Sequence, residues 1–192
     1  MTRTNDIGFE VPVREPLPEL ADLHLRHPGL TVDLCRAYAE AAGVCLSRHH
    51  TSPIEMSLTG VFAPCRRQVS WPAPSDRAAR AWGNRDDATR DGAYSLSLAA
   101  VEAEYGLTAI ARADTRTGAD FYVAPSGEHE DLENSYRLEV SGLDQTGESR
   151  LRSRLRRKIA QVEGGNASGP SLVIVVGFSA GRIAMAEVGG IQ

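Results

Sequence analysis

The sequence predicts a mixed fold of helices and strands, of the α/β (α+β) class, with a mixed central sheet flanked by helices. Two segments, 91–105 and 148–162, repeat apolar residues every three or four positions, as amphipathic helices do. Several shorter segments alternate apolar and polar residues, as half-buried strands do. In the second half of the chain these elements follow one another as helix, three strands, helix, strand, strand. The short links between the three strands favour an antiparallel meander.

The composition is that of a globular protein: 192 residues, 42% of them hydrophobic and 24% charged. The net charge of -4 argues against binding polyanions through bulk charge, but it permits a local basic surface. The longest apolar run is too short for a bilayer and the N-terminus lacks an apolar signal core, so we expect a cytoplasmic protein with no membrane partner. Three cysteines, an odd number, fit buried reduced thiols, since their spacing with His49 and His50 lacks the paired short intervals of common zinc sites.

Residues 1–75 are predicted to form an N-terminal elaboration that packs on a core domain of residues 76–192. Segment 9–30 holds four of the ten prolines, which predicts an irregular arm. Thr31 is a good N-cap and Gly43 a natural stop, so one amphipathic helix is expected between them.

A hairpin and a third short strand are predicted after this helix, in residues 44–48, 54–62 and 68–71. The polar, proline-containing turn 49–53 joins the first two. Prolines in 71–76 then break the pattern and mark the boundary with the core domain.

The core domain is predicted to begin with a short helix, 76–82, and a loop, 83–87. An apolar stripe then predicts a helix over 91–105 that ends at Gly106; its members are Tyr94, Leu98, Val101 and Tyr105. Three strands are expected after it, over 107–113, 119–124 and 136–141.

The last part of the chain predicts one helix and two strands. Leu151, Leu155, Ile159 and Val162 form the buried stripe of a helix over 148–162. The nearly continuous apolar run 171–178 suits an interior strand, and 182–188 is expected to pair with it through a turn at 179–181.

Two predicted strands carry a carboxylate on a polar face. Alternation groups Glu139 with Arg137 and Ser141, and it groups Asp120 with Tyr122. An ordinary half-solvated strand also accounts for Glu139. If the two strands are neighbours, however, the carboxylates converge, and at ~4 Å and an effective dielectric of ~20 they would repel by about 4 kcal/mol. They then need a cation, a shared proton or a wider separation, and hard oxygen ligands favour Mg²⁺ or Mn²⁺.

The order of elements and the placement of these acids resemble the PD-(D/E)XK nuclease superfamily, the restriction-endonuclease-like proteins, over residues 88–188. The resemblance implies an αβββαβ core. It also implies metal binding by Asp120, at the start of the second core strand, and by Glu139, within the third. A further acidic ligand often comes from the first helix, where Glu102 is the candidate and Asp91 its rival; both also suit a solvent-facing position. The implied activity is Mg²⁺-dependent hydrolysis of DNA, in bacterial defence or mobile-element biology.

Ser141 departs from the family pattern, which usually has Lys there. Some members place the Lys on the following helix, and Lys158 is then the catalytic candidate, with Arg154 and Gln161 on the same flank. A cation that simply lies on a surface helix is the alternative. Tyr122 and Arg137, beside the carboxylates, are candidates for substrate contact together with Ser141, Arg154 and Gln161. Covering the sheet would account for Tyr122 and Arg137 equally well.

Six cations in nine positions of the second helix suggest phosphate contact, although such a run also suits a solvated face; they are Arg150, Arg152, Arg154, Arg156, Arg157 and Lys158.

The leading hypothesis is therefore a metal-dependent DNA endonuclease, acting as a homodimer or within a larger complex. The alternative is a degenerate, non-cleaving nuclease fold that binds a protein or nucleic acid, which Ser141 favours. A small assembly or immunity protein with an incidental acidic pair is the third possibility.

Overall fold

The computed structural model describes residues 11–60, 63–114, 118–127, 132, 135–164 and 169–189. The helices are the 3₁₀ helix η1 (Leu20–Leu25), α1 (Val32–Ser47), α2 (Asp76–Ala81), α3 (Arg85–Tyr105) and α4 (Glu148–Glu163). The strands are β1 (Val13–Arg14), β2 (Ile54–Thr59), β3 (Cys65–Val69), β4 (Leu107–Arg112), β5 (Phe121–Pro125), β6 (Tyr136–Leu143), β7 (Ser171–Gly177) and β8 (Arg182–Val188).

The described strands form one mixed sheet in the order β1-β3-β2-β8-β7-β6-β5-β4. The predicted meander is confirmed, because β4, β5 and β6 pair antiparallel in sequence order. β7 then pairs parallel with β6, so the chain crosses over through α4, and β8 pairs antiparallel with β7 as predicted. The strands of the first 75 residues continue this same sheet, since β2 lies parallel beside β8.

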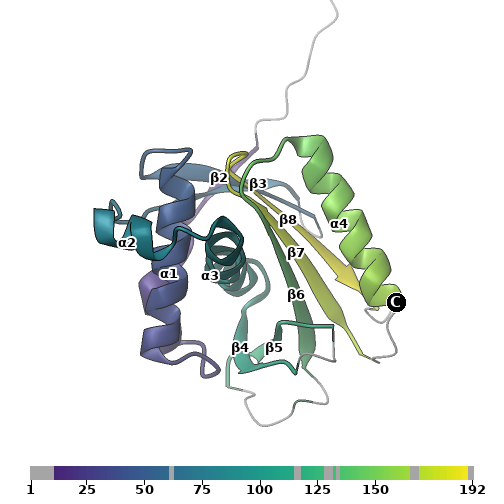
Figure 1. Cartoon of the computed structure of the whole chain (residues 1–192). Helices are drawn as coiled ribbons and strands as arrows, with labels where there is room; N and C mark the ends of the chain where they lie inside the picture. Colours follow the sequence, from purple (N-terminus) through teal and green to yellow (C-terminus); the bar gives the residue numbers. More distant parts are fainter. Residues whose placement is uncertain are drawn as a thin grey trace, which may run out of the picture.

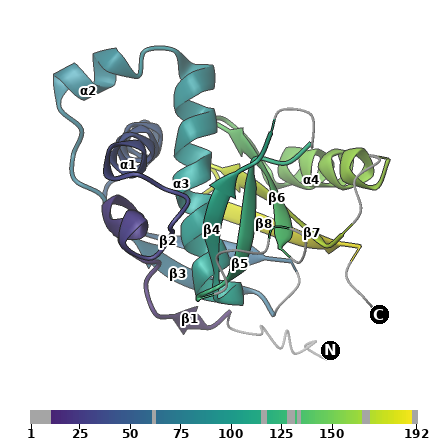
Figure 2. The ribbon, with the colours of Figure 1, turned by 90° about the horizontal axis from the view of Figure 1, so that it is seen from below.

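The two faces of the sheet are covered by different helices. Figures 1 and 2 show α1 and α3 on one face and α4 on the other. The α3 face holds the main core, which includes Phe121, Leu138, Val140, Leu172, Ile174 and Val176. The α4 face holds a smaller cluster of Leu143, Leu151, Val175 and Ala184. Because side chains alternate along a strand, Glu139, between Leu138 and Val140, lies on the α4 face.

The N-terminal helix is longer than the sequence predicts. Thr31 caps α1 as expected, its side chain accepting from the Leu34 N–H, but the predicted strand over 44–48 is wrong because α1 continues through Gly43 to Ser47. A Cβ at Gly43 would lie 3.4 Å from Cδ1 of Trp71. Gly43 therefore lets α1 pack closely against Trp71. In the sequence alone, a glycine at this position looks like a helix stop.

α3 also begins earlier than predicted. Asn84 caps it, and the helix starts at Arg85. The predicted loop 83–87 is therefore wrong from residue 85 onward, and only residues 83 and 84 precede the helix. Its C-terminal stop at Gly106 is confirmed; this residue adopts a left-handed conformation with φ of 66°. The extra turns place buried α3 residues against α1.

Gly92 marks the closest approach of α3 to α1. A Cβ at this position would lie 2.9 Å from backbone atoms of Ala42. We expect Gly92→Ala to lower the free energy of unfolding by about 1–2 kcal/mol, because the clash outweighs the better helix propensity of Ala. Urea denaturation measures this change. Gly43→Ala is the matched control, since a Trp71 side chain can shift where backbone cannot, and similar losses in the two variants would contradict the prediction.

Candidate functional site

Asp120 and Glu139 lie beside each other on adjacent chain segments. Phe121 of β5 and Leu138 of β6 are Cα partners, so the residues that flank them, Asp120 and Glu139, are at the same level of the sheet. The Asp120 N–H donates to the Leu138 carbonyl at 2.8 Å. β5 itself begins only at Phe121, one residue later than Asp120.

Two donors hold the Asp120 carboxylate. The Tyr94 hydroxyl of α3 donates to Oδ1 at 2.6 Å, and the Val140 N–H of β6 donates to Oδ2 at 2.8 Å. Burial and the bond to Asp120 raise the pKa of Tyr94, so its hydroxyl remains a donor at neutral pH. Because Asp120 precedes the regular strand, these bonds, rather than the alternation of β5, set the direction of its side chain.

Glu139 is buried, with 7% of its surface exposed, and it is paired with a cation. Nζ of Lys158, on α4, lies 2.5 Å from Oε1 of Glu139. Burial raises the pKa of Glu139; the bond from Lys158 opposes this rise, and the negative charge of Asp120 adds to it. The two carboxylates therefore act on each other electrostatically.

The carboxylates nevertheless take their side-chain partners from opposite faces of the sheet. Tyr94 belongs to α3 and Lys158 to α4, and these helices cover different faces (Figure 1). A cation shared by Asp120 and Glu139 would require Asp120 to leave Tyr94. In the described arrangement Tyr94 and Lys158 satisfy the pair separately.

The sequence marks Lys158 in a second way, besides its position on the helix. It is the only lysine in the sequence; the other 20 of the 21 Lys and Arg residues are arginines. Lysine carries a compact point charge on a flexible stem, whereas arginine presents a broad fork that needs more space. A single lysine, placed on a buried carboxylate, indicates that this position needs the smaller cation.

Arg137 and Gln161, two of the predicted substrate residues, lie with Glu139 in one small cavity. It has a volume of about 40 Å³, and its other lining residues are Gly118, Ala119, Val162 and Ser171. Tyr122 is the Cα partner of Arg137 across the β5–β6 pair. Gly118 and Ala119 immediately precede Asp120, so the cavity borders the segment that carries Asp120.

The remaining predicted contacts lie elsewhere. Ser141 lines a different cavity of about 190 Å³, together with Asp86 and Arg90. Arg154 is half-buried on α4; burial and the like charges of Arg157 and Arg150 lower its pKa. Neither Ser141 nor Arg154 lines the cavity that holds Glu139.

The structure places Glu102 in a separate cluster. Its carboxylate accepts from Arg26 Nε at 2.5 Å and pairs with Nε2 of the fully buried His27 at 3.0 Å. Burial raises the pKa of Glu102, but the bonds from His27 and Arg26 together lower it by more, so the pKa lies below its ordinary value. The rival Asp91 is bonded by Arg90. Ion pairs therefore hold both candidate acids of α3, and among the described residues neither forms a metal-binding group with Asp120 and Glu139.

The two candidate carboxylates belong to no larger metal-binding cluster among the described residues. Within that part of the chain, no group of three or more His, Cys, Asp or Glu side chains is arranged to hold a metal ion. All three cysteines are free and buried. A metal at the candidate site would therefore take two protein carboxylates and complete its shell with water or substrate.

α4 carries the basic surface that the sequence predicts. Arg150, Arg156 and Arg157 are exposed, whereas Arg152 pairs with Glu148 one turn away. No partner for Arg150, Arg156 or Arg157 occurs among the described residues. The same helix thus supplies both the cation on Glu139 and three solvent-facing positive charges.

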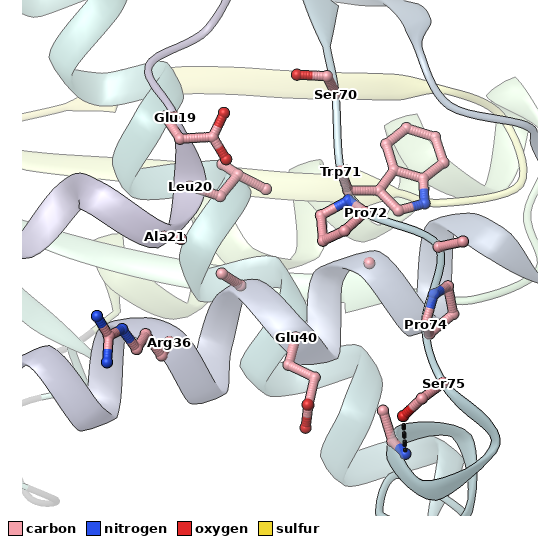
Figure 3. Close-up of a pocket in the computed structure, with 14 residues that line it drawn as sticks. Glu19, Leu20, Ala21, Arg36, Glu40, Ser70, Trp71, Pro72, Pro74 and Ser75 are labelled. Carbon is pink, nitrogen blue, oxygen red and sulfur yellow. Dashed lines mark hydrogen bonds between the residues drawn. The ribbon is translucent and has the colours of Figure 1, made fainter.

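A groove lies on the side of the molecule away from α4 (Figure 1). Figure 3 shows a groove between α1, with Arg36 and Glu40, and the segment of Trp71 and Pro72. Its volume is about 350 Å³ and its walls are mainly apolar. It contains neither carboxylate of the candidate pair, so this groove and the charged pair are separate features.

Comparisons with known proteins give no match: no family model, no curated protein and no known structure resembles the chain significantly. In the described part of the chain, no helix has the length and apolar character needed to cross a bilayer.

Proposed function

We propose that the protein is a metal-dependent nuclease that hydrolyses DNA phosphodiester bonds at a site built on Asp120, Glu139 and Lys158. The observation that carries this proposal is the placement of the three residues: two carboxylates at one level of adjacent segments, and the only lysine of the chain on one of them. Bacterial defence or mobile-element biology, in a homodimer or a larger complex, is the setting that we propose by resemblance.

The topology supports a restriction-endonuclease-like core. α3, the antiparallel strands β4, β5 and β6, the crossover α4 and the parallel β7 follow the αβββαβ order that the resemblance implies. Asp120 immediately precedes the second of these strands, and Glu139 lies within the third. Helices cover both faces of the sheet, as such a core requires.

Each residue has a defined task in this proposal. Mg²⁺ or Mn²⁺ would lower the pKa of a bound water and stabilise charge on the phosphoryl oxygens. Asp120 and Glu139 would hold the ion once Asp120 turns from Tyr94. Lys158, released from Glu139 as the ion takes that carboxylate, would place its charge beside the phosphate. The exposed arginines of α4 would contact neighbouring phosphates.

Cleavage by the purified protein tests this proposal directly. Supercoiled, linear and single-stranded DNA are incubated with Mg²⁺ or Mn²⁺, and a parallel sample contains chelator. We expect cut products from the wild type with metal and none from Asp120→Asn. The Asn oxygen can accept from Val140 N–H and its amide can donate to Tyr94, so this variant keeps the fold. Equal products from both proteins on every DNA form would refute cleavage by this site.

A non-cleaving, binding-only protein is the second candidate, and one observation favours it. Tyr94 and Val140 satisfy Asp120, and Lys158 neutralises Glu139, so the pair is stable without an ion. Calorimetric titration with Mg²⁺ or Mn²⁺ separates the candidates. If the protein is a nuclease, metal binding gives heat in the wild type and none in Glu139→Gln. If it only binds a partner, the wild type and Glu139→Gln give the same trace.

A further inference from the structure

We propose that the small cavity beside Glu139 binds one phosphate of a polynucleotide backbone, next to the phosphate that is cleaved. This inference deepens the proposed function and rests on it for the identity of the ligand. The cavity contains two buried donors, one on each of two adjacent strands. Oγ of Ser171, a residue only 2% exposed, and Nε of Arg137 have no hydrogen-bond partner among the described residues.

The fold places these two donors side by side. Arg137 of β6 and Ser171 of β7 are Cα partners in the parallel pair, and both lie on the α4 face by the alternation of their strands. Nη2 of Arg137 donates to the Gly169 carbonyl at 3.4 Å, which holds the guanidinium while Nε remains available. Two donors on adjacent strands can bind two oxygens of one tetrahedral group.

Unsatisfied donors indicate a ligand because leaving one buried costs about 1–3 kcal/mol. An apolar side chain at position 171 would avoid this cost. Phosphate oxygens are strong acceptors, and arginine recognises them well. A bound water needs at least about 10–15 Å³, so a cavity of about 40 Å³ also admits a phosphate oxygen from outside.

The local charge also suits an anion. Glu139 lines the cavity and would repel a phosphate, but Lys158 neutralises it. Arg137 then leaves the three side chains with a net charge of +1. Gln161 is exposed at the cavity and offers a further amide donor, so a backbone phosphate can approach from solvent.

Binding without metal tests the inference independently of cleavage. Inorganic phosphate and a short single-stranded DNA are titrated in chelator-containing buffer, by NMR shifts and fluorescence anisotropy respectively. We expect Arg137→Gln to weaken oligonucleotide binding about 10-fold and Ser171→Ala about 3- to 10-fold, the loss of one or two charge-assisted hydrogen bonds. Inorganic phosphate should bind weakly and lose affinity in both variants.

Two control variants separate this role from structure. Ser97→Ala, on α3, removes a hydroxyl that is equally buried and equally without a partner in the described part of the chain. Arg66→Gln, on β3, removes an exposed arginine. Neither should change binding. Without ligand, Ser171→Ala and Ser97→Ala should both be as stable as the wild type or more stable, so lower affinity in Ser171→Ala alone cannot come from unfolding.

Each remaining outcome overturns the inference. If inorganic phosphate binding depends on Arg137 and Ser171 but oligonucleotide binding does not, the cavity is a site for free phosphate. If neither probe is affected by either variant, the cavity holds water only. Because no metal is present, these results do not depend on whether Asp120→Asn loses cleavage, and failure of the subsite is therefore distinguishable from failure of the nuclease proposal.

Discussion

Glu139→Gln is expected to reduce metal-dependent DNA cleavage at least about 100-fold, which corresponds to about 2.7 kcal/mol of lost transition-state stabilisation. The substitution keeps the shape of the side chain and removes the charge that would hold the ion. Cleavage rates at saturating Mg²⁺ or Mn²⁺ measure the loss. Glu55→Gln, which removes an exposed carboxylate on β2, is the control and should cleave normally.

The same substitution should leave the protein equally stable or more stable. Burial raises the pKa of Glu139 in the folded state. A carboxyl with a raised folded pKa favours folding when protonated, and this contribution is lost as pH rises through the folded pKa. At neutral pH the ionised Glu139 therefore opposes folding, and Gln removes that cost while the partly exposed Lys158 can turn to solvent; we expect a gain of zero to about 1 kcal/mol. A variant that loses stability in parallel with activity would show that Glu139 has a structural role instead.

Local sequence patterns predict the second half of the fold well. The stripe of α4 and the continuous apolar run of β7 depend on residues close in the chain, and the structure has both elements near the expected bounds. The error at α1 arises because Gly43 looks like a helix stop. Its actual role, contact with Trp71, depends on a residue far along the sequence.

The candidate site is less predictable because its contacts are long-range. Alternation places Glu139 on a polar face, and the structure shows which cation lies there. No local pattern shows that Tyr94 bonds Asp120 or that His27 and Arg26 hold Glu102. Ser171 likewise begins an apolar run and carries no sequence signal of its own. An unpaired hydroxyl is recognised only once its surroundings are known.

Lys158→Met should lower the free energy of unfolding by about 3 kcal/mol at pH ~8. This loss is at the low end of the range for breaking a buried ion pair, because the Lys158 side chain is partly exposed. Without the cation, burial and the charge of Asp120 raise the pKa of Glu139 further above its ordinary value of 4.5. The penalty should therefore be small at about pH 4, where Glu139 is protonated in both states, and grow as pH rises until the folded pKa is passed. Urea denaturation across this pH range measures it.

Two further variants identify the cause of that penalty. Arg152→Met on the same helix breaks an exposed pair with Glu148 and should cost about 0.5 kcal/mol or less. The double variant Glu139→Gln with Lys158→Met leaves no charge in the pocket and should recover most of the lost stability. A penalty of equal size at every pH would instead mean that Lys158 contributes through the packing of its methylene groups.

Lys158→Arg separates the charge of this residue from its shape. Arginine keeps the positive charge, so we expect most of the stability to return at pH ~8. Its planar fork is broader than an ammonium group and cannot occupy the same point on Glu139 and then move to a phosphate beside the metal. Cleavage should therefore remain impaired in Lys158→Arg. Such a stable but inactive variant would explain why a chain that uses arginine at every other cationic position has lysine here.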